Sequence, residues 1–192
     1  YAMFEPDINT SKITVLPGEK SKSAKMASMI LDFFQINIGG TLKIASEILE
    51  GKGLASSSAD LVTTAYALKD AFNLNLNADL IAQFIAKIEP SDGTMYPGIT
   101  AFYYRDVKLK EPIAPTPKLH IISIDEGQQI DTLEYNRSEK HYSPTCCARY
   151  KAMLQEMIQA IRVQDLKTVG CLTTESAIMN QKHNYKRYLQ FM

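Results

Sequence analysis

The sequence has no excess of charge of either sign. Its 21 Lys and Arg residues balance 21 Asp and Glu residues, so the formal net charge at pH 7 is zero. A protein that binds nucleic acid through the phosphates normally presents a strongly basic face. This composition does not indicate one, and we expect no nucleic-acid partner.

Long apolar runs and a disulfide framework are also missing. No stretch approaches the roughly 20 apolar residues that cross a bilayer, so we expect no membrane partner. The three cysteines, Cys146, Cys147 and Cys171, are odd in number and irregularly spaced, which favours a reducing compartment such as the cytoplasm. No cluster of His, Cys and Asp has the spacing of zinc ligands. Hydrophobic residues make up 45% of the 192 positions, enough for one large domain or two small ones.

One stretch places glycines and small hydroxyl residues directly ahead of a helix. Residues 50–60 read Glu-Gly-Lys-Gly-Leu-Ala-Ser-Ser-Ser-Ala-Asp, and an apolar helical pattern continues from Leu61 to Phe72. The first N–H groups of a helix have no intrahelical partner and carry partial positive charge. Glycine lets the backbone approach a phosphate closely, so the stretch suits a phosphate group. The serines would cap the helix, donate to phosphate oxygens or bind Mg²⁺.

This stretch differs from two other phosphate-binding loops. It lacks the G-K-[ST] ending of a Walker A loop, and its spacing departs from the Rossmann fingerprint at Ser56. A serine cap after a glycine turn would explain the same residues without any ligand. From the residues alone, both interpretations stay open.

Residues 51–59 resemble the phosphate-binding motif of the GHMP kinases, whose usual form is P-x-x-x-G-L-G-S-S-A. Gly53, Leu54, Ser56 and Ser57 match this form. The leading proline is absent, position 55 holds Ala where Gly is usual, and position 58 holds Ser where Ala is usual. With a second stretch at 88–98, Ile-Glu-Pro-Ser-Asp-Gly-Thr-Met-Tyr-Pro-Gly, the chain is similar to the PduX-type L-threonine kinases of cobalamin synthesis.

The resemblance implies an α/β (α+β) fold of the two-domain GHMP-kinase type. An N-terminal α/β sandwich would occupy 1–110 and part of a second α/β domain 118–192. We expect an internal fragment that lacks both ends of the family's usual length. Residue patterns agree: they predict strands at 11–16, 42–48, 99–105 and 119–124, a turn at Gly39-Gly40 and a proline-rich linker at 111–117. Helices are predicted at 23–34, 61–72, 78–88 with Asn77 as N-cap, 150–162, and after a cap at Asp165.

The resemblance also implies ATP and Mg²⁺ as cofactors and assigns roles to particular residues. The ATP-binding residues would be Gly51, Lys52, Gly53, Leu54, Ala55, Ser56, Ser57 and Ser58. The catalytic pair would be Asp92 as the base and Glu89, which would hold the metal together with Ser57, although these two carboxylates could exchange roles. The substrate-binding residues would be Thr94, Tyr96, Arg105 and Arg137. Lys20 and Lys22 fit an exposed, solvated helix start better than a phosphate contact.

The implied activity is phosphoryl transfer from ATP to a small hydroxy amino acid, most simply L-threonine, giving O-phospho-L-threonine. Two alternatives stay open. The acceptor could be another alcohol such as homoserine or mevalonate, which has no amine to bind. The protein could instead be a catalytically inactive relative that binds ligand. The serine run and the acidic pair are both intact, which favours an enzyme.

Overall fold

A computed structural model of the chain describes residues 1–125, 127, 141–183, 185 and 187. The chain divides into two compact units. The first comprises Tyr1–Pro97 and Phe102–Lys110, and the second comprises Gly98–Ala101 and Glu111–Met192. The mixture of helices and strands confirms the expected α/β class.

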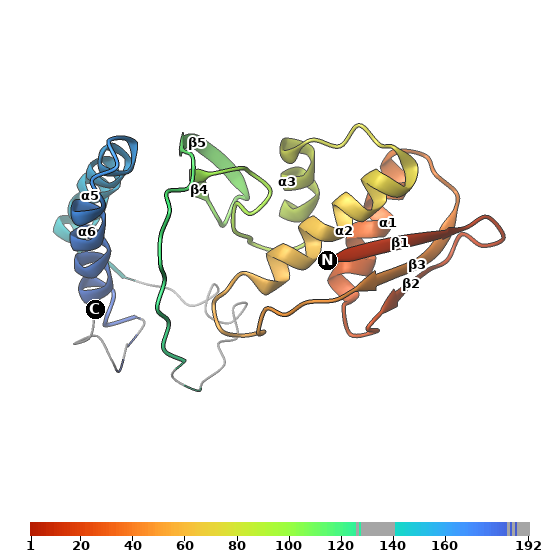
Figure 1. Cartoon of the computed structure of the whole chain (residues 1–192), viewed down its shortest axis with the longest axis horizontal. Coiled ribbons are helices and arrows are strands. Elements are labelled where there is room, and N and C mark those ends of the chain that lie inside the picture. Colours follow the sequence, from red (N-terminus) through yellow and green to blue (C-terminus); the bar gives the residue numbers. More distant parts are fainter. Residues whose placement is uncertain (126, 128–140, 184, 186, 188–192) are drawn as a thin grey trace. The chain divides into compact units, whose positions relative to one another are not determined.

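A three-stranded sheet forms the base of the first unit (Figure 1). Its strands are β1 (Ala2–Asp7), β2 (Ile13–Leu16) and β3 (Gly39–Ile44), and β3 lies between the other two, antiparallel to β1 and parallel to β2. In the register, Leu42 is the partner of both Phe4 and Val15. All three side chains are buried, so they form one apolar row across the sheet.

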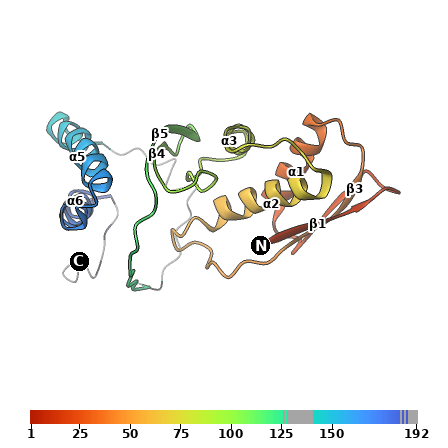
Figure 2. The same cartoon turned by 45° about the horizontal axis from the view of Figure 1, so that its top comes forward.

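Three helices lie on one side of this sheet (Figure 2): the first two pack against its strands, and the third packs against those two helices. They are α1 (Ser21–Phe33), α2 (Ser56–Phe72) and α3 (Ala78–Ala86). Helix α1 connects β2 to β3, the crossover that a parallel strand pair requires. The apolar residues of α1 recur at helical spacing, and Met26, Ala27 and Ile30 are fully buried. The predicted cap of α3 is confirmed: the side chain of Asn77 accepts a hydrogen bond from the Leu80 N–H at 2.9 Å.

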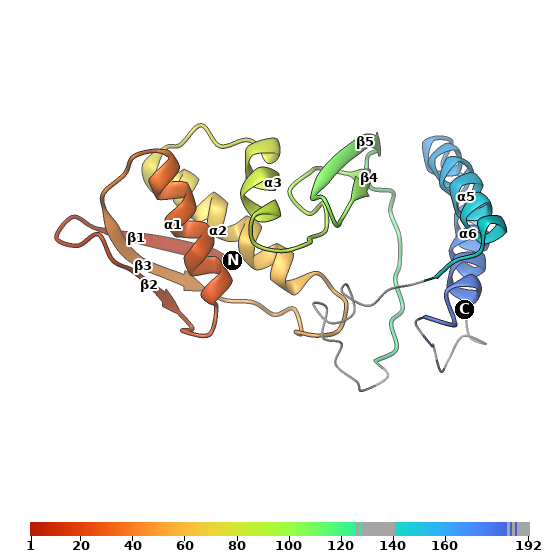
Figure 3. The same ribbon diagram turned by 180° about the vertical axis from the view of Figure 1, so that it is seen from behind.

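The connection from β3 to α2 is long and irregular (Figure 3). The strand predicted at 42–48 is displaced, because β3 ends at Ile44. The turn predicted at Gly39-Gly40 is wrong, since both glycines lie inside β3. A Cβ on Gly40 would lie 2.2 Å from the Glu5 carbonyl oxygen, so glycine is needed here for close strand approach.

Strands β4 (Ile99–Tyr103) and β5 (Lys108–Ala114) pair as a separate two-stranded sheet. The linker predicted at 111–117 is therefore partly wrong, because its first four residues complete β5. Pro112 is tolerated there because each strand of a two-stranded sheet has an unpaired edge.

The second unit contains a pair of helices, α5 (Pro144–Arg162) and α6 (Leu166–Met179). Helix α5 starts earlier than predicted, with Ser143 as its N-cap, and the predicted cap of α6 by Asp165 is confirmed. The strand predicted at 119–124 is wrong: these residues lie outside any strand, and Ile121 and Ile122 are 84% and 94% exposed. An apolar run becomes a strand only where a neighbouring strand accepts its backbone hydrogen bonds. Within the described ranges, no helix has the length and apolar character needed to cross a membrane.

Leu61 tests how far the first unit depends on the burial of α2. Its side chain is 0% exposed, so Leu61→Ala should lower the free energy of unfolding by about 2–5 kcal/mol through lost contacts and a residual cavity. Tyr66→Ala, on the same helix at a position 40% exposed, should cost about 1 kcal/mol or less. Equal losses in urea denaturation would contradict this packing.

Candidate active site

The glycine-rich segment at residues 51–58, called the glycine loop from here on, runs into the first turn of α2, as the sequence predicts. Helix α2 begins at Ser56, and its N-cap is Ala55, which makes no side-chain capping bond. The interpretation of a serine as the cap is therefore wrong. The backbone is left-handed at Gly51, Gly53 and Ala55, with φ of 71°, 72° and 57°. Left-handed residues alternating along a loop turn successive N–H groups toward one side, which makes an anion-binding concavity.

Ser57 and Glu89 meet at the first turn of α2. The Ser57 hydroxyl donates a hydrogen bond to one carboxylate oxygen of Glu89, and the Lys22 ammonium pairs with the other. Glu89 is only 7% exposed, and a buried carboxylate without such partners would be strongly destabilising. This contact joins the starts of α1 and α2 to the segment that follows α3.

A second buried contact fixes the acidic loop. The Ser91 hydroxyl donates to the Ser58 hydroxyl oxygen at 2.7 Å, and the Asp92 N–H donates to the same oxygen at 3.2 Å. Ser58 and Ser91 are buried, whereas Asp92 is exposed. The backbone of Asp92 is thus held against α2 while its carboxylate faces outward.

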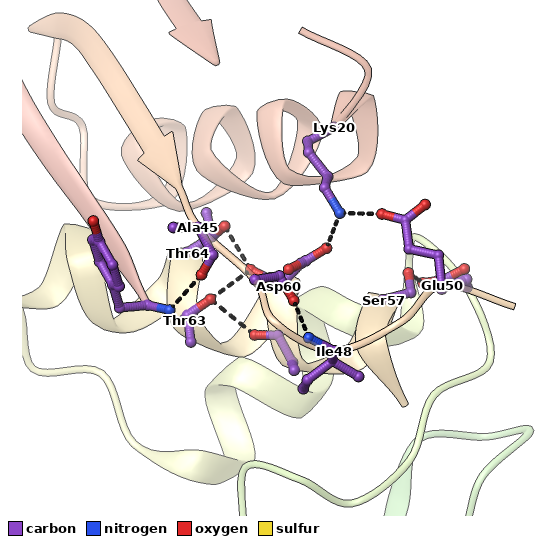
Figure 4. Close-up of polar contacts among 12 residues, drawn as sticks. Lys20, Ala45, Ile48, Glu50, Ser57, Asp60, Thr63 and Thr64 are labelled. Atoms are coloured by element: carbon purple, nitrogen blue, oxygen red, sulfur yellow. Dashed lines mark hydrogen bonds and ion pairs between the residues drawn. The ribbon is translucent and has the colours of Figure 1, made fainter. Parts of the chain in front are cut away.

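Lys20 lies between two carboxylates that flank the loop (Figure 4). Its ammonium pairs with Glu50, directly before Gly51, and with Asp60 at 2.7 Å, two residues beyond Ser58. Burial acts to lower the pKa of Lys20, but hydrogen bonds and charge attraction from both carboxylates outweigh it, and the pKa is raised. The hydrogen bond from Lys20 lowers the pKa of Glu50. The expectation that Lys20 is solvated is wrong, since its side chain is 14% exposed.

The predicted substrate residues are more dispersed. Thr94 is exposed, and the Tyr96 hydroxyl donates to Asp79 of α3 at 2.7 Å. The guanidinium of Arg105, which is exposed, donates from Nε to the Tyr104 hydroxyl at 3.1 Å. Arg137 lies outside the described residues.

Comparison with known proteins bears directly on this arrangement. Residues 22–104, which contain the loop, Ser57, Glu89 and Asp92, match the family model described as the GHMP kinases N terminal domain. This match confirms, over residues 22–104, the resemblance to the GHMP kinases that the sequence motifs indicated.

Individual relatives of this chain are kinases of small molecules by name. It is 25% identical over 171 residues to an L-threonine kinase of Citrobacter freundii and 24% identical over 181 residues to one of Salmonella typhimurium, covering 86% and 90% of this chain. A 4-diphosphocytidyl-2-C-methyl-D-erythritol kinase of Shouchella clausii is 27% identical over 169 residues, or 86% of this chain. The chain spans 59%, 60% and 54% of the lengths of these three relatives.

A solved structure shares the fold. The crystal structure of homoserine kinase from Cytophaga hutchinsonii superimposes with a TM-score of 0.64 at 14% sequence identity. The superposition covers 89% of this chain and 60% of the homoserine kinase chain. The expected GHMP-kinase-like fold is thus confirmed.

The donor set at the start of α2 fits Mg²⁺. The Ser57 hydroxyl and the Glu89 carboxylate are hard oxygen donors already in contact, and Mg²⁺ favours one or two carboxylates together with phosphate oxygens. Among the described residues, no group of three or more His, Cys, Asp and Glu could hold a metal ion. A metal here would therefore be shared between the protein and a bound phosphate rather than enclosed by side chains.

Sequence patterns did not reveal the partners of these site residues. Lys22 lies 67 positions before Glu89, and Lys20 lies 30 and 40 positions before Glu50 and Asp60. Two lysines at a helix start are common on any surface, and no local pattern indicates which carboxylates they meet. The Ser91 hydroxyl lies in the Pro-Ser-Asp stretch, but its burial against Ser58 follows only from the packing.

Ala55 provides a test of the loop geometry. A left-handed alanine costs roughly 1–2 kcal/mol, which exceeds the extra unfolded-state entropy that glycine brings. Ala55→Gly should therefore raise the free energy of unfolding by about 0.5–1 kcal/mol. Ala59→Gly, inside α2, should lower it by about 1 kcal/mol. Two losses of equal size in urea denaturation would contradict the left-handed N-cap.

Tyr96 gives the site a pH-dependent signal. Burial, and then the hydrogen bond to Asp79 and its charge, raise the pKa of Tyr96 to about 12. Because the folded pKa exceeds the ordinary 10.0, the resulting stability is complete below about pH 10 and is lost as the pH rises toward 12. In an ultraviolet titration, Tyr96→Phe should remove one high-pH ionisation and Asp79→Asn should move it to lower pH. An unchanged titration in Asp79→Asn would contradict the role of Asp79.

Proposed function

We propose that this protein is an ATP-dependent kinase that phosphorylates the hydroxyl group of a small metabolite. One observation carries the proposal: the glycine loop ends at the first turn of α2, where Ser57 contacts the buried Glu89 beside Lys22. Such a site combines backbone N–H groups for phosphate oxygens with hard oxygen donors for a metal. The match of residues 22–104 to the GHMP kinases N terminal domain supports the same reaction class.

The substrate that we propose is L-threonine. Two relatives that are 25% and 24% identical to this chain are named L-threonine kinase. A small hydroxy amino acid needs one partner for its ammonium and another for its carboxylate. Glu89 or Asp92 offers negative charge for the ammonium, and Arg105 or Arg137 offers a bidentate partner for the carboxylate. Thr94 and Tyr96 would line the remaining pocket. The product, O-phospho-L-threonine, would then serve cobalamin synthesis.

The steps of the proposed phosphoryl transfer are assigned to the loop, Ser57, Glu89 and Asp92. The N–H groups of the loop bind the β- and γ-phosphates of ATP and orient the γ-phosphorus toward the acceptor. Ser57 and Glu89 would hold Mg²⁺, which would supply positive charge against the phosphate oxygens. As the substrate oxygen bonds to the γ-phosphorus and the bond to the β,γ-bridging oxygen breaks, Asp92 takes the hydroxyl proton and ADP leaves.

The proposal is tested by a phosphoryl-transfer assay followed by phosphorus NMR. ATP and Mg²⁺ are incubated with L-threonine, L-serine, L-homoserine, mevalonate or 4-diphosphocytidyl-2-C-methyl-D-erythritol in separate reactions. We expect a new phosphomonoester with L-threonine. Asp92→Asn should slow its formation by about 10²–10⁴-fold, the usual contribution of a positioned base, and Ser57→Ala should also slow it. Asp70→Asn, which changes an exposed carboxylate of α2, should leave the rate unchanged.

The other outcomes of this assay separate the alternatives. A product with a different alcohol would keep the kinase and replace the substrate. Binding of ATP without any product would contradict an enzyme and favour a catalytically inactive, ligand-binding relative. Full activity in Asp92→Asn would remove that residue from the role of base.

A further inference from the structure

The glycine loop is bordered on both sides by carboxylates that share one cation. Glu50 directly precedes Gly51, Asp60 follows Ser58 by two residues, and the ammonium of Lys20 pairs with both. Lys20 lies on a different segment, at the N-cap position of α1, so the bridge connects the loop to a second helix.

The two halves of the bridge differ in exposure. The side chains of Lys20 and Asp60 are 14% and 10% exposed, whereas that of Glu50 is 66% exposed. Lys20 is anchored by α1, whose residues Met26 and Ala27 are fully buried, and Asp60 adjoins the fully buried Leu61. The Lys20–Asp60 pair is therefore fixed to the core, and Glu50 is the movable partner.

We propose that Lys20 is a positioning residue that holds the start of the glycine loop against α1 and α2 in the geometry that binds nucleotide. The inference rests on the proposed binding of ATP by this loop. Through Glu50 and Asp60, the ammonium fixes the residue that precedes the loop relative to the start of α2. The N–H groups of residues 51–56 are then oriented before the phosphates arrive, so less ordering is needed on binding.

Removal of the Glu50 carboxylate distinguishes this positioning role from a direct contact between Lys20 and a phosphate. If Lys20 bound the phosphates itself, removal of Glu50 would release the ammonium from one of its two carboxylates and remove a negative charge near an anionic ligand. Both effects would tighten ATP binding. If Lys20 acts by positioning, removal of Glu50 weakens ATP binding, because the loop loses its fixed start.

The decisive variant is Glu50→Ala, because Glu50 is exposed and its loss should leave the protein folded. We expect faster hydrogen exchange of the amides of residues 51–56 without nucleotide, and ATP binding weaker by about fivefold, the upper range for one exposed ion pair. In turnover, KM for ATP should rise while kcat stays nearly unchanged. The matched control is Glu47→Ala, which removes an exposed carboxylate from the same connection between β3 and α2. It should change neither the hydrogen exchange of the loop, nor the ATP affinity, nor KM.

Lys20 itself gives a second test. Lys20→Met leaves Asp60 without its cation and should destabilise the protein, whereas the guanidinium of Lys20→Arg can still bridge two carboxylates. Lys20→Arg should therefore retain slow exchange in the loop and nearly the original ATP affinity. Loss of both in Lys20→Arg would overturn the positioning role.

The two hypotheses fail in different ways. Exchange in Glu50→Ala equal to that of the unchanged protein, or tighter ATP binding, overturns the positioning role and leaves the kinase proposal intact. If the unchanged protein binds no ATP, the proposed function fails together with the purpose of the bridge. The exchange comparison, made without nucleotide, then still decides whether Lys20 orders the loop.

Discussion

The contact among Glu89, Ser57 and Lys22 is the interaction on which the rest of the first unit depends. A carboxylate that is 7% exposed must be compensated inside the protein, and here the partners come from the first turns of α1 and α2. The contact therefore joins three segments that are far apart in the sequence. The Glu89 carboxylate and the Ser57 hydroxyl of this contact are also oxygen donors that suit Mg²⁺, so under the proposed function a structural and a functional role would coincide at Glu89.

The loop before α2 shows how this chain departs from the GHMP pattern without losing its geometry. The resemblance places glycine at position 55, yet the alanine found there keeps a left-handed backbone with φ of 57°. The packing of α2 must compensate for that strain, because Leu61, Ala65 and Leu68 are all fully buried. An alanine also has fewer accessible backbone conformations than glycine. The loop thus combines local strain with restricted motion, a combination often found at ligand sites.

Charge is distributed unevenly in a chain with no net charge. Two lysines and three carboxylates converge around the loop as Lys20 with Glu50 and Asp60, and Lys22 with Glu89. Opposite charges placed close together hold the loop without creating a strongly positive surface. This agrees with a ligand that is bound largely by oriented backbone N–H groups.

The sequence by itself determined the features that depend on neighbouring residues. Helical spacing indicated α1, α2, α3 and α5, and cap chemistry indicated Asn77 at α3 and Asp165 at α6. The glycine-serine run indicated a loop at a helix start and the resemblance to the GHMP kinases. Only the tertiary structure decided which apolar runs find a partner strand, so residues 119–124 form no strand while 39–44 form the centre of a sheet. It also decided the pairing of Lys20 and Lys22 with carboxylates 30 to 67 positions away. Such contacts follow from the path of the whole chain, because a local pattern specifies a residue's conformation but not its distant neighbours.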